Sequence, residues 1–204
     1  SVWDGRYLLA WARELRAIRL PDGTRPPLAG RAPIFADMIA SVLEDGPESI
    51  AVSFGLTCLL VMVAFRAPRE RLLVLGSLLL GVIGMAGAMA LLRIKLNFLN
   101  FVAFPITFGN GVDYAVNVAK RHALEHARGN TEAVHTTLSA SGGAVMVCSL
   151  TTVVGYASLL VSSNLALRSF GLCMAISELT CLAAAMLALP AALLLLDRRG
   201  PTAP

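Results

Sequence analysis

One carboxylate lies inside a run of residues that is otherwise apolar enough to cross a membrane. Asp113 stands within residues 104–118, and an ionised Asp near the centre of a spanning helix costs about 2.5 to 3.5 kcal/mol on insertion scales. Burial disfavours the charged carboxylate, and protonation removes the charge. We therefore predict that Asp113 is a proton-carrying group in a membrane transporter.

Helical spacing gives this acid its neighbours. At about 100° per residue, one stripe of the helix collects Gly109, Asn110, Asp113, Asn117 and Lys120. If Lys120 marks the cytoplasmic interface, Asp113 lies about 10 Å inside a hydrocarbon layer of about 30 Å. Pro105 removes one backbone donor from the same helix, so we expect a kink there.

The next apolar run supplies hydroxyl groups. Ser141, Cys148 and Thr152 share a small, weakly polar face of a helix predicted at about 139–161. Thr152 is the first candidate for a hydroxyl that meets Asp113, and Thr151 is the second. The alternative for either residue is a hydrogen bond to a carbonyl of its own helix one turn back.

A second acid, Glu178, falls within the last apolar run. It lies about ten residues from Arg168, or about 15 Å along a helix, and so near the membrane midplane. Two interpretations stay open. Glu178 is either a second proton site or a neutral carboxylic acid that is hydrogen-bonded between helices.

Composition and run length predict an all-α membrane protein. The 204 residues are 56% hydrophobic and 15% charged, and the apolar runs approach the roughly 20 residues that a spanning helix needs. We expect a bundle of five transmembrane helices at about 49–65, 71–92, 98–118, 139–161 and 168–196. They form a transmembrane domain over residues 48–197, followed by a cytoplasmic tail at 198–204.

The first 47 residues differ from the rest. Spacing predicts an amphipathic helix over residues 3–18, then a turn-rich break and a second helical pattern that ends at residues 45–47. So short a segment with so small a core is marginal by itself. We interpret residues 1–47 as the end of an extracytoplasmic, porter-like domain.

Basic residues in the connections predict the orientation. Eight of them lie at 66–71, 120–128 and 198–199, against three at Arg93, Lys95 and Arg168. The larger set marks the cytoplasmic side. The residues before the first span are then extracytoplasmic and the C-terminus is cytoplasmic.

Small residues indicate where helices approach closely, because packing drives association in lipid. We assign this role to Gly81, Gly84, Gly109, Gly111, Gly142 and Gly143. The four cysteines lie in apolar runs without a C-x-x-C pair, so we expect no disulfide framework, metal site or cofactor. The net charge of +4 comes without a basic stripe or stacking aromatics, which argues against nucleic acid as a partner.

An enzyme is the rival from another class. His122-Ala-Leu-Glu-His126 matches the H-x-x-E-H motif of inverted zinc proteases. The acids downstream that could supply a third ligand are only Glu132, Glu178 and Asp197, and Glu178 is expected in mid-membrane. We therefore predict no enzymatic activity, with a zinc metalloprotease as the alternative.

Three stretches together resemble the resistance-nodulation-division (RND) permease superfamily. They are Lys95–Tyr114, with its Gly-x-x-x-Asp-Tyr element, Ser149-Leu-Thr-Thr152 and Leu189-Pro-Ala-Ala-Leu193. The likeness covers about residues 28–196. It is strongest to the lipid exporters that include the mycobacterial large membrane proteins (MMPL) and the hopanoid transporters.

The resemblance implies two repeats of six spans, of which this chain looks like the end of the second. Asp-Tyr elements of the fourth and tenth spans face each other in the family as a proton relay, which implies that role for Asp113 and Tyr114. A hydroxyl of the following span assists, which matches Thr151 or Thr152. A scaffold or protein-export accessory of the same fold is the alternative function.

The resemblance also implies partners and a location. The expected partners are a lipid or other hydrophobic substrate, membrane lipids and the N-terminal half of the same transporter, with a homo-oligomer as a further possibility. The expected location is the bacterial cytoplasmic (inner) membrane.

Overall fold

The structure, a computed structural model, describes residues 5–19, 23, 30–95 and 97–198. The described residues are mostly helical and contain no strand, which confirms the all-α prediction. The chain divides into two units, one up to Ala51 and one from Val52 onward. The predicted cytoplasmic tail lies outside the described residues, except for Arg198.

The first unit pairs a short helix with the start of a long one. Helix α1 (Gly5–Ala17) buries Leu8 and Ala12 against Ala36 of helix α2 (Arg31–Ala64), and Arg16 forms an ion pair with Asp37. Helix α1 matches the amphipathic helix predicted over residues 3–18. Residues 3 and 4, and most of the predicted turn after this helix, lie outside the described part.

The predicted helix break at residues 45–47 is wrong, because α2 continues through Pro47. A proline inside a helix removes one backbone donor but leaves the other hydrogen bonds of the turn available. Ser49 also donates its hydroxyl to the carbonyl of Asp45 at 2.9 Å, which adds a local bond across this turn. Flanking residues with good helical spacing therefore outweigh one Asp-Gly-Pro sequence.

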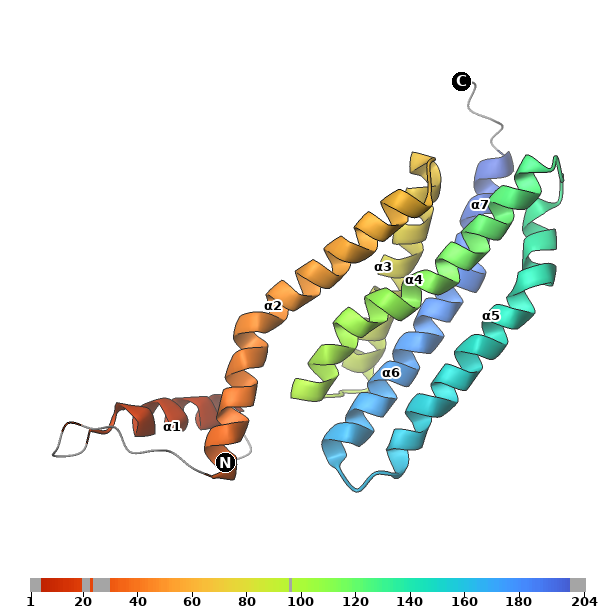
Figure 1. Ribbon diagram of the computed structural model, residues 1–204. Helices are drawn as coiled ribbons and strands as arrows, with labels where there is room; N and C mark the ends of the chain where they lie inside the picture. Colours follow the sequence, from red (N-terminus) through yellow and green to blue (C-terminus); the bar gives the residue numbers. More distant parts are fainter. Residues whose placement is uncertain (1–4, 20–22, 24–29, 96, 199–204) are drawn as a thin grey trace. The chain divides into compact units, whose positions relative to one another are not determined.

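The second unit is a helical bundle. After the end of α2 it contains α3 (Pro68–Leu91), α4 (Phe98–Ala127), α5 (Ala133–Ser158) and α6 (Leu165–Ala183), and ends with α7 (Leu189–Arg198). Figure 1 shows these helices side by side along a common direction, with α7 continuing the line of α6. Helix α6 packs against α3, α4 and α5, so it occupies the middle of the bundle.

Four helical segments of the described residues are long and apolar enough to cross a membrane: Arg31–Ala64, Pro68–Leu91, Ala133–Val161 and Leu165–Leu196. They correspond to four of the five predicted spans. The fifth predicted span corresponds to α4, which has 30 residues and packs against α3, α5 and α6. Its polar stripe lowers its hydropathy, and it is not one of the four segments named above. Helix α4 also extends past the predicted end at residue 118, because a helix does not stop where its residues become charged.

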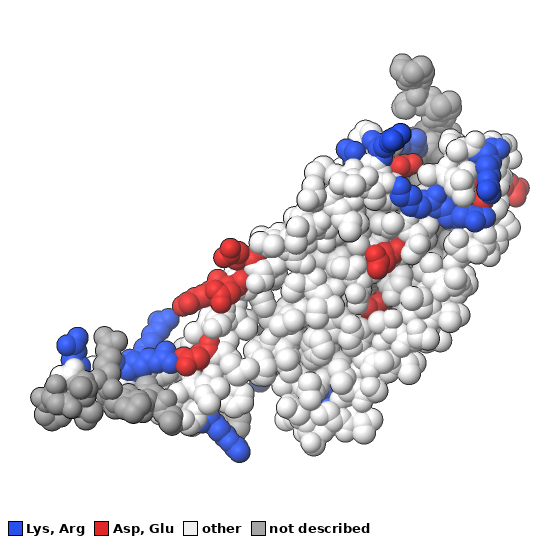
Figure 2. All heavy atoms as spheres, viewed as in Figure 1, with Lys and Arg blue, Asp and Glu red and all other residues white. Residues whose placement is uncertain are grey.

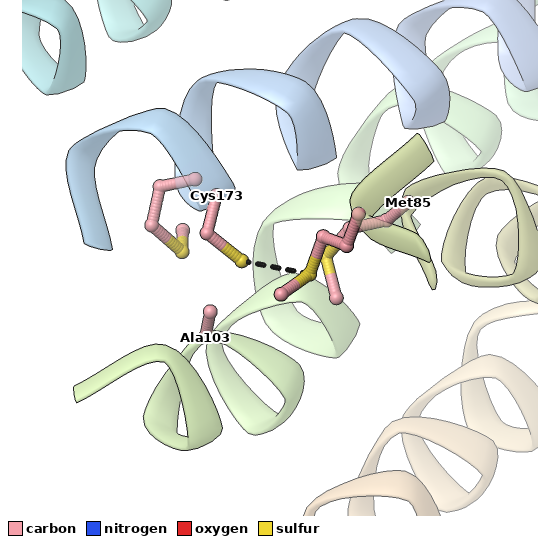
Figure 3. Packing of buried hydrophobic residues seen from close by; sticks show 5 residues of the cluster. Met85, Ala103 and Cys173 are labelled. Carbon is pink, nitrogen blue, oxygen red and sulfur yellow. Dashed lines mark hydrogen bonds between the residues drawn. The ribbon is translucent and has the colours of Figure 1, made fainter. Parts of the chain in front are cut away.

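Sulfur-containing side chains fill one part of the core. Met85 and Met89 of α3 meet Ala103 of α4 and Cys173 of α6, and Cys173 donates its thiol hydrogen to the Met89 sulfur at 3.2 Å. Figure 3 shows Met85, Ala103 and Cys173 pointing into this cluster. Polarizable, unbranched methionines suit such irregular gaps between helices.

Two glycines let α6 approach its neighbours at one point. A Cβ atom at Gly81 of α3 or at Gly111 of α4 would lie 2.7 Å from the sulfur of Cys181 on α6. Gly142 of α5 is also tight, since its Cβ would lie 2.9 Å from Met186. These close approaches fit the helix-packing role assigned to the three glycines.

The other three glycines of that prediction differ among themselves. A Cβ at Gly84 would lie 3.3 Å from Thr180, a contact to which the neighbour adjusts by a small shift. A Cβ at Gly109 or Gly143 would meet no atom within 4 Å in the described residues. Packing within this part of the chain therefore explains Gly84 in part and does not explain Gly109 or Gly143.

The last span changes its winding ahead of Pro190. Residues Ala184–Ala188 form a π-helical segment between α6 and α7, and the N–H of Leu189 bonds the carbonyl of Ala184. Proline has no N–H to give to the carbonyl four residues earlier, and a wider turn is a common way to absorb such a defect. The helix continues through Pro190 to Arg198.

Candidate functional site

Helices α4, α5 and α6 line an open cavity of about 570 Å³ in the second unit. Its wall carries both acids singled out from the sequence, together with amides, hydroxyls and small side chains. The lining residues are Asn110, Asp113, Tyr114, Asn117, Ala140, Ser141, Ala144, Val145, Cys148, Thr152 and Glu178.

The polar stripe of α4 supplies the polar side of this cavity. Asn110, Asp113 and Asn117 are spaced by three and four residues, so they share one helix face, and all three line the cavity. Lys120, predicted on the same stripe, points elsewhere. Its ammonium bonds the carbonyl of Ala64 and lies 4.4 Å from the ring centroid of Phe65.

Asp113 is exposed in this unit. Among the described residues it has no ion-pair or hydrogen-bond partner. Figure 2 shows acidic atoms in the middle of a face that is otherwise uncharged, away from the basic end of the bundle. A carboxylate with no fixed cation or donor can gain or lose a proton without breaking an existing bond.

Glu178 has the opposite environment. It is 2% exposed on α6 and accepts two hydrogen bonds from α4, one from the Tyr114 hydroxyl at 2.5 Å and one from the Asn110 amide at 3.1 Å. Sequence reasoning left open whether this acid is hydrogen-bonded between helices, and these contacts are of that kind. Sequence reasoning missed both donors, although Asn110 and Tyr114 are four residues apart on one helix face.

The hydroxyls of the two threonine candidates form hydrogen bonds within their own helix. Thr151 and Thr152 both donate to the carbonyl of Cys148, at 2.7 and 3.0 Å. This is the alternative that the sequence left open for each of them. Thr152 nevertheless lines the same cavity as Asp113, whereas Thr151 is exposed and is not part of its lining.

The H-x-x-E-H residues lie on the last turns of α4. The rings of His122 and His126 stack at 5.9 Å between centroids. The carboxylate of Glu125 is 5% exposed and is paired with Arg121 at 2.8 Å and Arg128 at 3.3 Å. No cluster of three metal-ligating side chains occurs in the part of the chain that the structure describes.

Thiol labelling tests whether water reaches the cavity. Cys148 is exposed and lines the cavity, while Cys173 is fully buried. In membrane vesicles of the full-length protein, a water-soluble maleimide is expected to label Cys148 and to spare Cys173, as measured by mass spectrometry of the peptides. Cys148→Ser should remove the label, and an unlabelled Cys148 in the wild type would contradict a wet cavity.

Comparison with known proteins gives the chain its relatives. A model of the MMPL family matches residues 9–204. The chain is 28% identical over 188 residues to "Putative membrane protein MJ1562" of Methanocaldococcus jannaschii, covering 88% of this chain and 48% of that protein. It is 34% identical over 168 residues to "Putative membrane protein SCO6666" of Streptomyces coelicolor, covering 78% of this chain and 23% of that protein.

The chain thus spans about half the length of the first relative and about a quarter of the second. The match of the family model over nearly the whole chain agrees with the likeness found in the sequence, and the apolar helices agree with a protein that crosses the membrane several times. This chain is a multi-pass membrane protein that belongs to the MMPL family.

Proposed function

We propose that the chain is part of a proton-driven transporter that exports lipid or other hydrophobic molecules, with Asp113 as the proton-carrying carboxylate. One observation carries this proposal. Asp113 opens into a polar cavity within a set of membrane-type helices, and it has no partner among the described residues. A purely structural Asp in such a place would be paired, because an unpaired charge in lipid is costly.

Protonation of Asp113 supplies the energy difference that transport needs. Each proton that crosses with the field supplies about 2.3 kcal/mol per 100 mV. Neutral Asp113 tolerates an apolar surrounding and ionised Asp113 requires water or a donor, so the two forms favour different helix arrangements. A ligand shifts a conformational equilibrium only through such a differential interaction.

Other residues of the cavity assist this step in the proposal. Tyr114 follows Asp113 and is 6% exposed, and Thr152 faces the same cavity from α5. Both are within the family pattern that the sequence resembles. We propose that the open side of Asp113 is completed by the N-terminal half of the same transporter, because the chain covers only part of its relatives.

The same proposal includes an orientation in a cytoplasmic membrane. Figure 2 shows Lys and Arg gathered at the end of the bundle where α4 and α7 end. Basic connections favour the cytoplasmic side, so this end is proposed to be cytoplasmic, and the residues before the first span at about 49–65 are proposed to be extracytoplasmic. We propose no hydrolytic role for His122 and His126, because two arginines already neutralise Glu125, which would have to act as the general base.

Reconstitution of the full-length protein tests this function. With an imposed pH gradient, liposomes are expected to pass a fluorescent phospholipid to acceptor vesicles while an entrapped dye reports coupled proton movement. A protonophore should stop both signals. Lipid transfer at an unchanged rate after collapse of the gradient would contradict a proton-driven exporter.

A further inference from the structure

The buried acid of α6 has hydrogen-bond donors but no cation. Its two partners, Tyr114 and Asn110, are neutral, and no Lys, Arg or His of the described residues bonds it. The other titratable groups near it are Asp113 of α4, Cys148 and Tyr156 of α5, and Cys181 of its own helix, whereas α3 presents Gly81 at this level. Burying an unpaired charge among neutral groups is unfavourable, so Glu178 has reason to bind a proton.

A permanently protonated Glu178 would need an acceptor for its own O–H. The hydroxyl of Tyr114, 2.5 Å from Oε2, can serve, because a phenol both donates and accepts. Its own hydrogen then needs a new acceptor. Ser149 lies beside this hydroxyl, is fully buried, and its Oγ has no hydrogen-bond partner among the described residues.

Tyr114 and Ser149 together provide hydrogen-bond partners for both the ionised and the protonated form of Glu178. When Glu178 is ionised, Tyr114 donates to its Oε2. When Glu178 is protonated, it donates to the Tyr114 oxygen, and the Tyr114 hydrogen turns to Ser149. The change needs only rotation of one O–H bond, and it employs the otherwise unpartnered atom of Ser149.

A path for the proton is also present. Glu178 and Asp113 line the same cavity. Its volume of about 570 Å³ leaves room for well over ten waters at about 30 Å³ each. Asn110 and Asn117 supply further polar groups on the wall between the helices, and two to four polar partners are what an internal water requires.

We propose that Glu178 is a second proton-binding group, which exchanges its proton with Asp113 through the cavity and is held in place by Tyr114, Asn110 and Ser149. This inference rests on the proposed function for its role in transport. The binding of a proton to Glu178 is a separate property that does not depend on transport activity.

Infrared difference spectroscopy of the full-length protein in nanodiscs tests the binding directly. Between acidic and alkaline buffer, the protonated-carboxyl bands of the wild type are expected to include one from Glu178 and one from Asp113. Glu178→Gln should remove one of them, and Asp113→Asn should remove the other and leave the Glu178 band. Loss of no band in a folded Glu178→Gln protein would overturn the proposal.

A matched pair of variants tests the positioning groups. Asn110→Leu removes a donor to Oε1 and is expected to shift the frequency of the Glu178 band, while Asn117→Leu, on the same face of α4 and in the same cavity, should leave it unchanged. Equal effects of the two variants would contradict the assigned contact. Ser149→Ala removes the acceptor for the Tyr114 hydrogen, so it is also expected to shift the frequency of the Glu178 band.

Measuring transport together with the Glu178 band distinguishes an error in this inference from an error in the proposed function. If proton-driven transport is absent but the Glu178 band titrates, the proposed function is wrong and the proton site stands. If Glu178→Gln transports lipid with the wild-type number of protons per lipid, the second site has no part in coupling and the proposal is overturned.

Discussion

Replacing Asp113 with Asn in the full-length protein is expected to abolish proton-driven transport while leaving membrane insertion intact. Asn has nearly the same shape but cannot bind and release a proton, and Asp113 has no partner in the described residues that the change would break. One proton supplies about 2.3 kcal/mol per 100 mV, so its loss lowers the sustainable concentration ratio by about 50-fold for each 100 mV. Lipid transfer from liposomes under an imposed pH gradient measures this effect.

A second acid provides the control for this variant. Glu132 is exposed at the start of α5 and does not line the cavity, so Glu132→Gln makes the same chemical change outside the site. It should transport at the wild-type rate. Wild-type transport by Asp113→Asn would end the assignment of Asp113 as the proton carrier.

Replacing Gly81 with Val is expected to destabilise the bundle strongly. A Cβ atom at this position would lie 2.7 Å from the sulfur and 2.9 Å from the Cα atom of Cys181, so the backbones of α3 and α6 must separate. Overpacking of a tight core costs about 1 to 3 kcal/mol, and more where backbone has to move. The melting temperature of the purified full-length protein in detergent measures the loss.

Gly87 is the matched control on the same helix. A Cβ atom there meets no atom within 4 Å in the described residues, so Gly87→Val adds the same side chain in open space. The melting temperature of this variant should stay close to that of the wild type. An equal decrease for both variants would show that valine in α3, and not the contact with Cys181, is responsible.

Much of the fold can be predicted from the apolar runs, because a spanning helix satisfies its own backbone and so depends mainly on length and hydropathy. The runs around Leu78, Val154 and Met174 each lie in a helix of the expected type. Helix ends are less predictable. The residues from His122 to Ala127 extend α4 beyond the apolar segment, because helical hydrogen bonds do not require apolar side chains.

The site is partly predictable for a similar reason. The spacing of Asn110, Asp113 and Asn117 along one helix places them on one face, and all three line the cavity. Contacts between residues of different helices cannot be predicted from spacing along one helix. Tyr114 and Glu178 are 64 residues apart in the chain, and the rotation of α6 that joins them follows from packing against three other helices.

Predictions that rest on one residue agree with the structure in some cases and not in others. Pro47 follows Asp45 and Gly46, a sequence typical of turns, yet the helix continues because its neighbours on both sides favour helix. Thr152 lies on the cavity as its helical position predicts, but its hydroxyl bonds the carbonyl of Cys148. Position along a helix is thus better determined by sequence than the partner of a particular hydroxyl.

The contact of Cys181 with Gly81 and Gly111 fixes α6 between α3 and α4 one turn away from Glu178. With backbones this close, α6 has no free space in which to slide or tilt alone, because packed helices shift between discrete arrangements and do not deform continuously. We therefore expect that a change of charge at Glu178, as proposed above, would move α3, α4 and α6 together and not α6 alone.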